Sequence, residues 1–238
     1  VIRPASVIST VYGANATYLT PFITPCKKGD SACIIRSAQA AVPFLAAGIP
    51  ELNVPSVDPM VLKVVKSEEA GLRLTLKNTT VTGMKDCTIE DTRLNEATDK
   101  LDVVVRCSVV LRGWYKLRGT ILVLPIRGEG KDTIKIRDIV ITANTKLATV
   151  KGADGQEHWH ISKWDHSFDV RTKTTFDFEN LFDGNKALSD PVDAIVNANW
   201  KLVMTEIAPP IVRAITERVV AAVDAFFAAV PANELQIY

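Results

Sequence analysis

The chain has 238 residues, with 28 Lys or Arg against 27 Asp or Glu, so its formal net charge is +1. This length suits one large or two small domains, and we predict a single one. The basic residues are scattered, which argues against a nucleic acid or an anionic membrane surface as partner. The most apolar stretch is interrupted by Arg213, Glu217, Arg218 and Asp224, well short of the roughly 18 uncharged residues of a membrane span. We therefore expect no stable membrane insertion.

Residues 1–25 carry little fold information, and we assign them to an N-terminal tail. The chain begins at Val1, which is compatible with removal of a signal peptide or with a vector remnant. Two sequons, Asn15-Ala16-Thr17 and Asn78-Thr79-Thr80, are compatible with a secretory route, although such triplets also arise by chance. The prediction is a secreted, extracellular protein.

Cys26 and Cys33 enclose a short polar loop of a size that a disulfide can span. Two free thiols or half of a metal site are the alternatives. The chain has no Cys-x-x-Cys pair and no histidine close to these thiols, which argues against zinc. We therefore predict a disulfide, which stabilises a loop of this size by about 2–3 kcal/mol in the chain-entropy model.

Residues 31–47 are rich in alanine and place Ile34, Ala38 and Val42 at helical spacing, with Gly48 after them as a stop. This predicts a short first helix. Residues 48–60 contain three prolines, which predict an ordered, extended connector because proline sustains neither a helix nor a central strand.

From Gly71 the period of the apolar residues changes to two, which predicts half-buried strands. The alternating positions are Leu72, Leu74 and Leu76; Leu101, Val103, Val105, Cys107, Val109 and Leu111; Leu122 and Leu124; Ile134 and Ile136; and Phe176 and Phe178. Turn signals separate these strands, including Gly128-Glu129-Gly130 and Asp154-Gly155. No helix fits between them, so we predict a mainly antiparallel meander, which excludes a doubly wound nucleotide-binding fold.

After Asn185 the apolar residues recur every three or four positions, which predicts one apolar stripe along a long helix. The stripe consists of Val192, Val196, Trp200, Val203, Ile207, Ile211, Ile215, Val219, Ala222 and Phe226. Because the stripe keeps its phase across Pro209-Pro210, we expect a kink there and not two unrelated helices.

The only large apolar surface left to cover this helix is the inner face of the strands. We therefore predict an α+β fold: a long, strongly curved antiparallel β-sheet rolled around a long C-terminal α-helix, with a short N-terminal helix and an internal hydrophobic tunnel.

Several motifs between about Cys26 and Leu235 point to a known family. They are Cys26 and Cys33 with Asp30 between them, Gly48-Ile49-Pro50-Glu51-Leu52 leading to Asp58-Pro59, Asn180-Leu181-Phe182, Asn197 through Trp200, Glu206 with Pro209, and Phe226 to Leu235 with Pro231. In these the chain resembles the insect takeout and juvenile-hormone-binding proteins. The resemblance implies one ligand-binding domain over residues 26–238, secretion in an arthropod, and carriage of a hydrophobic ligand in a tunnel.

The hormone binders of this family carry a second disulfide that ties the C-terminal helix to the sheet. Here no cysteine follows Cys107, so the chain is more similar to the takeout branch. A different second bridge is open: a hairpin centred near Ala97 places Cys87 almost opposite Cys107, whereas a register one residue different would put them on opposite faces.

Two motifs suggest other chemistry. Gly29-Asp30-Ser31 is similar to the nucleophile block of one lipase class, but it lies in a short loop and not on a strand-to-helix elbow, and no His-Asp set is placed to activate the serine. His158 and His160 would share a strand face, as two metal ligands require.

The neighbours of these histidines argue against a metal. Trp159, Ile161, Trp164 and Phe168 indicate that the opposite face is buried, which would leave the imidazoles on solvent or at a rim. We predict no metal, no cofactor and no catalytic residue.

The sequence thus predicts a secreted, non-enzymatic carrier of a long-chain hydrophobic ligand, such as a lipid, an isoprenoid or a juvenile-hormone-like molecule. A secreted interaction protein with a solid core is the alternative, with any receptor or protein partner unidentified. An esterase is a third hypothesis. The expected ligand-binding positions share a buried strand face or helix stripe, or belong to the first helix: Phe44, Leu45, Leu74, Leu76, Val105, Val109, Leu122, Leu124, Ile136, Phe168, Phe178, Trp200, Val203, Ile207, Ile211 and Ile215.

Overall fold

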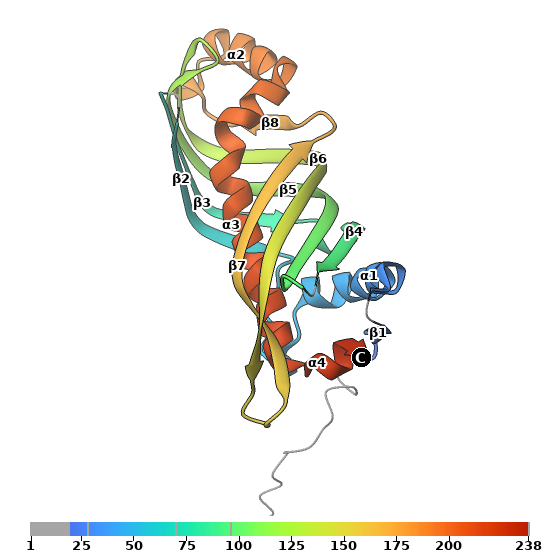
Figure 1. Ribbon diagram of the computed structural model, residues 1–238. Helices are drawn as coiled ribbons and strands as arrows, with labels where there is room; N and C mark the ends of the chain where they lie inside the picture. Colours follow the sequence, from blue (N-terminus) through green and yellow to red (C-terminus); the bar gives the residue numbers. More distant parts are fainter. Residues whose placement is uncertain (1–19, 28, 70, 96, 238) are drawn as a thin grey trace, which may run out of the picture.

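The computed structural model describes residues 20–27, 29–69, 71–95 and 97–237. Figure 1 shows a long, curved antiparallel sheet that bends around one long C-terminal helix, with a short N-terminal helix at one end. The predicted fold class is confirmed. The first sequon, at Asn15, and most of the predicted tail lie outside the described residues.

The strands and helices follow one another in nearly the predicted order. The strands are β1 (Cys26–Lys27), β2 (Met60–Glu69), β3 (Leu72–Thr82), β4 (Thr88–Asn95), β5 (Lys100–Ile121), β6 (Leu124–Lys151), β7 (Glu157–Val170), β8 (Thr175–Phe178) and β9 (Gln236–Ile237). The α-helices are α1 (Ser31–Ala47), α2 (Lys186–Ala198), α3 (Trp200–Ala229) and α4 (Ala232–Leu235), and the 3-10 helices are η2 (Pro50–Leu52), η3 (Met84–Asp86) and η4 (Phe182–Gly184).

The main sheet is an antiparallel meander. Its strand order is β2-β3-β5-β6-β7, with β4 paired to β5 and β8 paired to β6. A separate parallel pair, β1 and β9, brings the N-terminal segment beside the C-terminal one. The edge strands β2 and β7 lie closest to α3, so the sheet curls until both of its edges meet the helix (Figure 1).

Strand β2 has no counterpart among the predicted strands. Its inward residues include Met60, Leu62 and Val65, whereas Val61 and Val64 point outward and are exposed. Apolar residues therefore occupy both faces, and the buried positions change parity within the strand. For this reason the period-two signal fails here.

The turn between β5 and β6 lies at a different place from the predicted one. Leu122 and Val123 form a two-residue hairpin turn, with Leu122 at φ 59°, and Ile121 pairs with Leu124. The prediction of a strand at these positions is therefore wrong for Leu122, whereas Leu124 is the first residue of β6. Leu122 and Val123 have strand-like apolar side chains, yet they connect two strands.

Gly128 and Gly130, predicted as a turn, lie inside β6. A Cβ on Gly128 would come within 2.6 Å of the Tyr115 hydroxyl and 3.0 Å of the Leu181 Cα, and one on Gly130 within 2.5 Å of the Glu179 carbonyl oxygen. These glycines allow the 179–181 segment to cross the strand closely. The other predicted turn, at Asp154-Gly155, does connect β6 to β7.

Both cysteine pairs are bridged. The Cys26–Cys33 disulfide has a Cα–Cα distance of 5.6 Å, and the Asp30 side chain between them accepts a hydrogen bond from the Cys33 amide at 2.9 Å. Asp30 is thus the N-cap of α1. A structural role therefore accounts for Asp30 in the lipase-like triplet.

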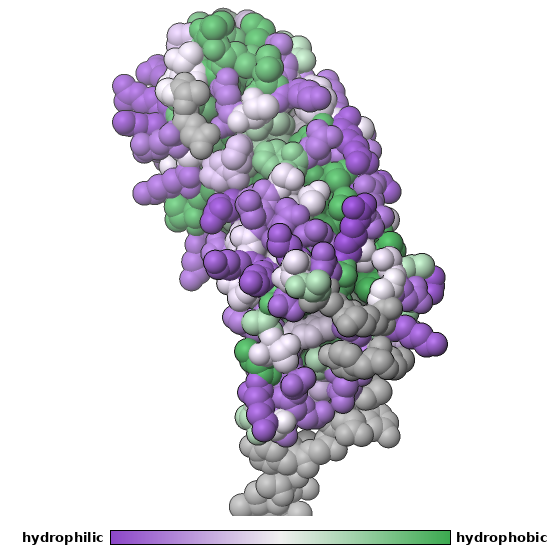
Figure 2. Space-filling model, viewed as in Figure 1, coloured by the Kyte–Doolittle hydropathy of each residue, from purple (hydrophilic) through white to green (hydrophobic). Residues whose placement is uncertain are grey.

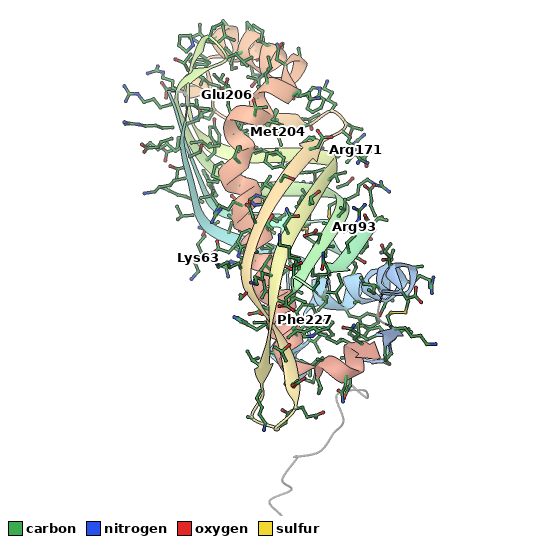
Figure 3. The ribbon with its side chains drawn as sticks, viewed as in Figure 1. Lys63, Arg93, Arg171, Met204, Glu206 and Phe227 are labelled. Carbon is green, nitrogen blue, oxygen red and sulfur yellow. A yellow bond between two sulfur atoms is a disulfide. The ribbon has the colours of Figure 1, made fainter. Side chains whose placement is uncertain are left out.

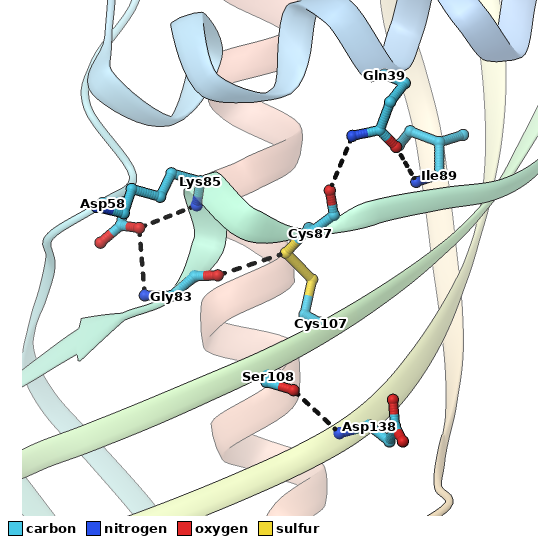
Figure 4. Close-up of a disulfide and its surroundings, with 9 residues drawn as sticks. All are labelled: Gln39, Asp58, Gly83, Lys85, Cys87, Ile89, Cys107, Ser108 and Asp138. Atoms are coloured by element: carbon cyan, nitrogen blue, oxygen red, sulfur yellow. Dashed lines mark hydrogen bonds between the residues drawn. A yellow bond between two sulfur atoms is a disulfide. The ribbon is translucent and has the colours of Figure 1, made fainter.

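The second disulfide joins Cys87 to Cys107, with a Cα–Cα distance of 4.5 Å (Figure 4). The adjacent pairing of Thr88 with Arg106 is the register of a hairpin centred near residue 97. Gln39 of α1 docks on this corner: its amide nitrogen donates to the Cys87 carbonyl at 3.1 Å, and its amide oxygen accepts from the Ile89 nitrogen at 2.7 Å.

The C-terminal apolar stripe is carried by two helices. The chain leaves helical geometry at Asn199, whose side-chain nitrogen donates to the Ile195 carbonyl at 2.9 Å and so competes with helix continuation. Helix α3 then runs for 30 residues, about 45 Å, through Pro209 and Pro210. The single long helix that we predicted is therefore divided at Asn199, ten residues before the proline pair, and α3 continues through both prolines.

Residues 20–25 lie within the predicted tail, yet they pack against α1. Phe22 stacks on Phe44 with ring centroids 4.2 Å apart, and the Thr24 amide donates to the Ser37 hydroxyl at 2.9 Å. Thr20 itself is buried. The packed part of the fold therefore begins at or before Thr20.

Candidate functional site

The predicted ligand-binding residues gather mainly where α3 faces the sheet. Those that are fully buried in the shared core are Leu74, Leu76, Val109, Ile136 and Phe178 from the strands, and Val203, Ile207, Ile211 and Ile215 from α3. Figure 3 labels Met204 and Glu206 on the first half of α3 and Phe227 near its end. The apolar stripe thus does face the inner side of the sheet, because helical and strand periodicity orient both surfaces toward each other.

A small, wholly apolar cavity lies in this interface. It is lined by Leu111, Ile134 and Ile136 from the sheet and by Met204, Ile207, Ala208, Ile211 and Val212 from α3. Its volume is about 10 Å³, close to the minimum that holds one water molecule. Ligand pockets for small molecules are usually about 300–1,000 Å³. At this place in the interface the apolar space is therefore much smaller than the preformed tunnel that we expected.

Three of the predicted residues, Ile136, Ile207 and Ile211, line this cavity. The sequence prediction missed its other walls. On the helix these are Met204, Ala208 and Val212, which follow one another at intervals of four beside the chosen stripe. Their regular spacing was visible in the sequence, and a wider stripe would have included them.

The remaining predicted residues lie elsewhere or only partly in the core. Phe44 is 46% exposed and stacks on Phe22, outside the α3 interface. Leu124 begins β6 beside the exposed hairpin turn. The partly buried residues that pack against the core are Leu45, Val105, Leu122, Phe168 and Trp200.

An open groove of about 520 Å³ separates β7 from the middle of α3. Its walls are His166, Ser167, Phe168, Pro209, Pro210 and Arg213. The Arg213 guanidinium lies 5.4 Å from the centre of the Trp164 ring, in cation–π contact. This groove is the point at which the predicted residue Phe168 meets the proline pair.

The burial of His158 differs from our expectation. His158 is 4% exposed, with Nε2 3.1 Å from the Asp154 carboxylate and Nδ1 3.4 Å from the Phe227 carbonyl oxygen. It is therefore a core residue and not a rim residue. Only His160 is exposed, and its Nδ1 lies 3.1 Å from the Asp224 carboxylate.

His158 is buried because the C-terminal segment covers it, through a bridge to Pro231 and the contact with the Phe227 carbonyl oxygen. Across the described ranges, no group of three or more His, Cys, Asp or Glu side chains could hold a metal ion.

Polar atoms also occur on the inner face of the sheet. Asp132 is 3% exposed and Thr79 is 0% exposed, and their side-chain oxygens have no hydrogen-bond partner among the described residues. Burial raises the pKa of Asp132 to about 6. Nearby, the Tyr115 hydroxyl donates to the Glu179 carbonyl oxygen at 2.7 Å, and burial raises the pKa of Tyr115 far above its usual range.

The end of the molecule near α2 presents apolar side chains to solvent. Figure 2 shows hydrophobic residues gathered at this end, over α2. Large exposed apolar residues occur in the β5–β6 turn, in α2 and at the start of α3, and they are Val123, Leu188, Ile195 and Leu202. In the part of the chain that the structure describes, no helix is long and apolar enough to span a bilayer.

Comparison with known proteins agrees with this architecture. The haemolymph juvenile hormone binding protein (JHBP) family model matches residues 5–236. The circadian clock-controlled protein daywake of Drosophila melanogaster is 27% identical over 224 residues, which cover 88% of this chain and 85% of that protein. The juvenile hormone-binding protein of Manduca sexta is 32% identical over 74 residues, 30% of this chain and 32% of that protein.

A solved structure shows the same fold. The crystal structure of Takeout 1 from Epiphyas postvittana superposes with a TM-score of 0.88 at 31% identity, and the match covers 91% of this chain and 100% of that one. The family model spans nearly the whole chain, and the predicted takeout-like resemblance is confirmed. This chain belongs to the haemolymph juvenile hormone binding protein family.

Proposed function

We propose that this protein is a secreted, non-enzymatic carrier that holds a long-chain hydrophobic molecule between α3 and the inner face of the sheet. The carrying observation is the wholly apolar lining of the cavity at that interface. The family and the Takeout 1 likeness support a hydrophobic ligand. A lipid, an isoprenoid or a juvenile-hormone-like molecule fits such a lining.

The ligand must enlarge the cavity as it enters. The backbone of α3 lies closest to the edge strands β2 and β7, and buried side chains of α3 and of the central strands β5 and β6 face the space between them. Met204 lines this space, and its unbranched side chain can change conformation to make room for a ligand. A sixteen-carbon chain would gain about 13 kcal/mol gross at about 0.8 kcal/mol per CH₂. That gain must exceed the repacking and ordering costs.

Two features favour an extracellular location. Both disulfides are of a kind that persists in oxidising compartments. The second sequon is accessible, because Asn78 is exposed on β3. The Manduca sexta relative is named as a hormone-binding protein, and we propose for this chain only the shared class of ligand.

Mass spectrometry of an organic extract of the purified protein tests the proposal. We expect an enriched long-chain lipid or isoprenoid, and saturable binding of the fluorescent probe N-phenyl-1-naphthylamine to the extracted protein. Heat-unfolded protein is the control. Absence of both signals would instead favour a solid-core interaction protein, and hydrolysis of p-nitrophenyl palmitate would favour an esterase.

A further inference from the structure

We propose that Asp132 and Thr79 form a polar end to the ligand site and select a long-chain ligand that ends in a hydroxyl group. This inference rests on the proposed carrier function and specifies its ligand class. The two side chains come from different strands, β6 and β3, and both face the core.

Both groups are buried without partners in the described part of the chain. Among the described residues, Asp132 supplies the only carboxylate oxygens that are buried with no hydrogen-bond partner, and the Thr79 hydroxyl is also unpartnered. Buried polar groups in native proteins almost always have a partner, because an unmade hydrogen bond costs the full desolvation of the group. A carboxylate in this position therefore calls for a donor from outside the described chain.

The two side chains lie close together on the inner face of the sheet. Asp132 of β6 pairs directly with Gly113 of β5. On the other side of Gly113, the Thr79 hydroxyl lies 2.5 Å from the position that a Gly113 Cβ would occupy. Facing side chains of paired strands are about 5 Å apart at Cβ. The hydroxyl therefore lies about one side-chain spacing from Asp132, over a glycine that leaves room between them.

This arrangement depends on an irregularity of β3. Asn78 has φ 47°, and the pairing with β5 shifts register between Lys77 and Thr80. The shift turns Thr79 inward, beside Gly113. Without it, Thr79 would lie on the same side as the exposed Lys77.

The polar pair is continuous with the apolar cavity. Leu111 pairs with Ile134, and both line the cavity. Each lies two residues along its strand from Gly113 or Asp132, and therefore on the same face. A hydrocarbon chain lodged against α3 would thus have its end next to the polar pair. The nearby Tyr115 hydroxyl is already used by the Glu179 carbonyl.

The chemistry of the pair favours a hydroxyl group over other polar ends. The Thr79 hydroxyl donates to the ligand oxygen, and the ligand hydroxyl donates to the Asp132 carboxylate, so one group satisfies both. An ether or ester oxygen only accepts and leaves the carboxylate unpartnered. A fatty-acid carboxylate would be repelled by Asp132 whenever both are ionised.

Competition binding tests this selectivity. Lipid-extracted protein is loaded with N-phenyl-1-naphthylamine at pH 7.5, and the probe is displaced with dodecan-1-ol, 1-methoxydodecane or dodecanoate. We expect the alcohol to bind at least about tenfold more tightly than the ether, since a hydrogen bond to a charged group is worth about that much. Dodecanoate should bind more weakly than the alcohol.

Variants assign the preference to the pair. Asp132→Val should bring the alcohol-to-ether ratio close to one while the ether still binds, because only the alcohol donates to Asp132. Thr79→Val should weaken the alcohol and the ether together and leave their ratio nearly unchanged, because either oxygen can accept from the Thr79 hydroxyl. Thr92→Val is the matched control, because Thr92 is another buried threonine with an unpartnered hydroxyl, on β4, and it should keep the wild-type ratio. If Asp132→Val does not fold, Asp132→Asn decides the result, because an amide can donate to an ether oxygen as well as accept from a hydroxyl, which should bring the ratio close to one.

The outcomes separate the two proposals. A ratio near one in the wild type, as expected if only a buried water satisfies Asp132, overturns the hydroxyl inference but leaves the carrier function standing. A wild-type ratio that survives in a folded Asp132 variant overturns it as well. If neither the probe nor any dodecyl compound binds, the carrier function fails and the inference fails with it.

Discussion

The burial of Asp132 has a consequence for stability that does not depend on any ligand. Burial raises its pKa to about 6, from an ordinary value of 3.8. The folded protein then holds the proton more tightly than the unfolded chain does. This contribution to stability is fully present below about pH 4 and is lost as the pH rises through 6. Each pH unit is worth about 1.4 kcal/mol, so about 3 kcal/mol is lost.

Asp132→Asn removes this titration while it keeps the size and shape of the side chain. We expect the ligand-free variant to gain about 3 kcal/mol of unfolding free energy relative to wild type between pH 4 and pH 7. Urea unfolding of both proteins at several pH values measures the difference. Burial also raises the pKa of Asp193. Asp193 and the other titrating groups are the same in both proteins, so their contributions to the pH dependence cancel in this comparison. A difference that does not change with pH would refute the reasoning.

Three further predictions concern packing and cross-links. Ile211→Trp should lower stability by about 1–3 kcal/mol and weaken probe binding, because the cavity beside it holds only about 10 Å³; an unchanged melting temperature would indicate a roomier site. Gly128→Ala should cost a similar amount in urea unfolding, since its Cβ would lie 2.6 Å from the Tyr115 hydroxyl, and full stability would show that the 179–181 segment yields. Replacing Cys87 and Cys107 together by alanine should lower the free energy of unfolding by about 3 kcal/mol, given their separation of 20 residues. If the variant and the oxidised wild type unfold at the same urea concentration, this prediction is wrong.

Much of the fold could be predicted from local patterns. The bounds of α1 follow from helical spacing and from Gly48, which ends the helix at φ 83°. Period-two alternation in Leu72, Leu74 and Leu76 predicted the buried face of β3, and all three are buried. The absence of a helix between the strands required antiparallel neighbours, because parallel strands need long crossovers.

Irregularities in the strands were beyond such reasoning. In β6 the inward positions change from Ile134 and Ile136 to Ile139 and Ile141, because Asp138 takes φ 47° and the register with β5 shifts there. Alternation assigns residues to one of two faces, but a single inserted residue exchanges the faces. The sequence does not mark where the sheet must bend around a helix.

The candidate site shows the same division between sequence and tertiary structure. The apolar stripe of Ile207 and Ile211 and the family motifs could be found from the sequence alone, because periodicity and short motifs are local properties. The packing of distant segments decided how little space remains beneath that stripe. It also decided that Asp132 is buried, although a charged side chain in a strand ordinarily indicates the solvent face. Both depend on which distant side chains meet, and β3, β5, β6 and α3 bring them together only when the sheet closes around the helix.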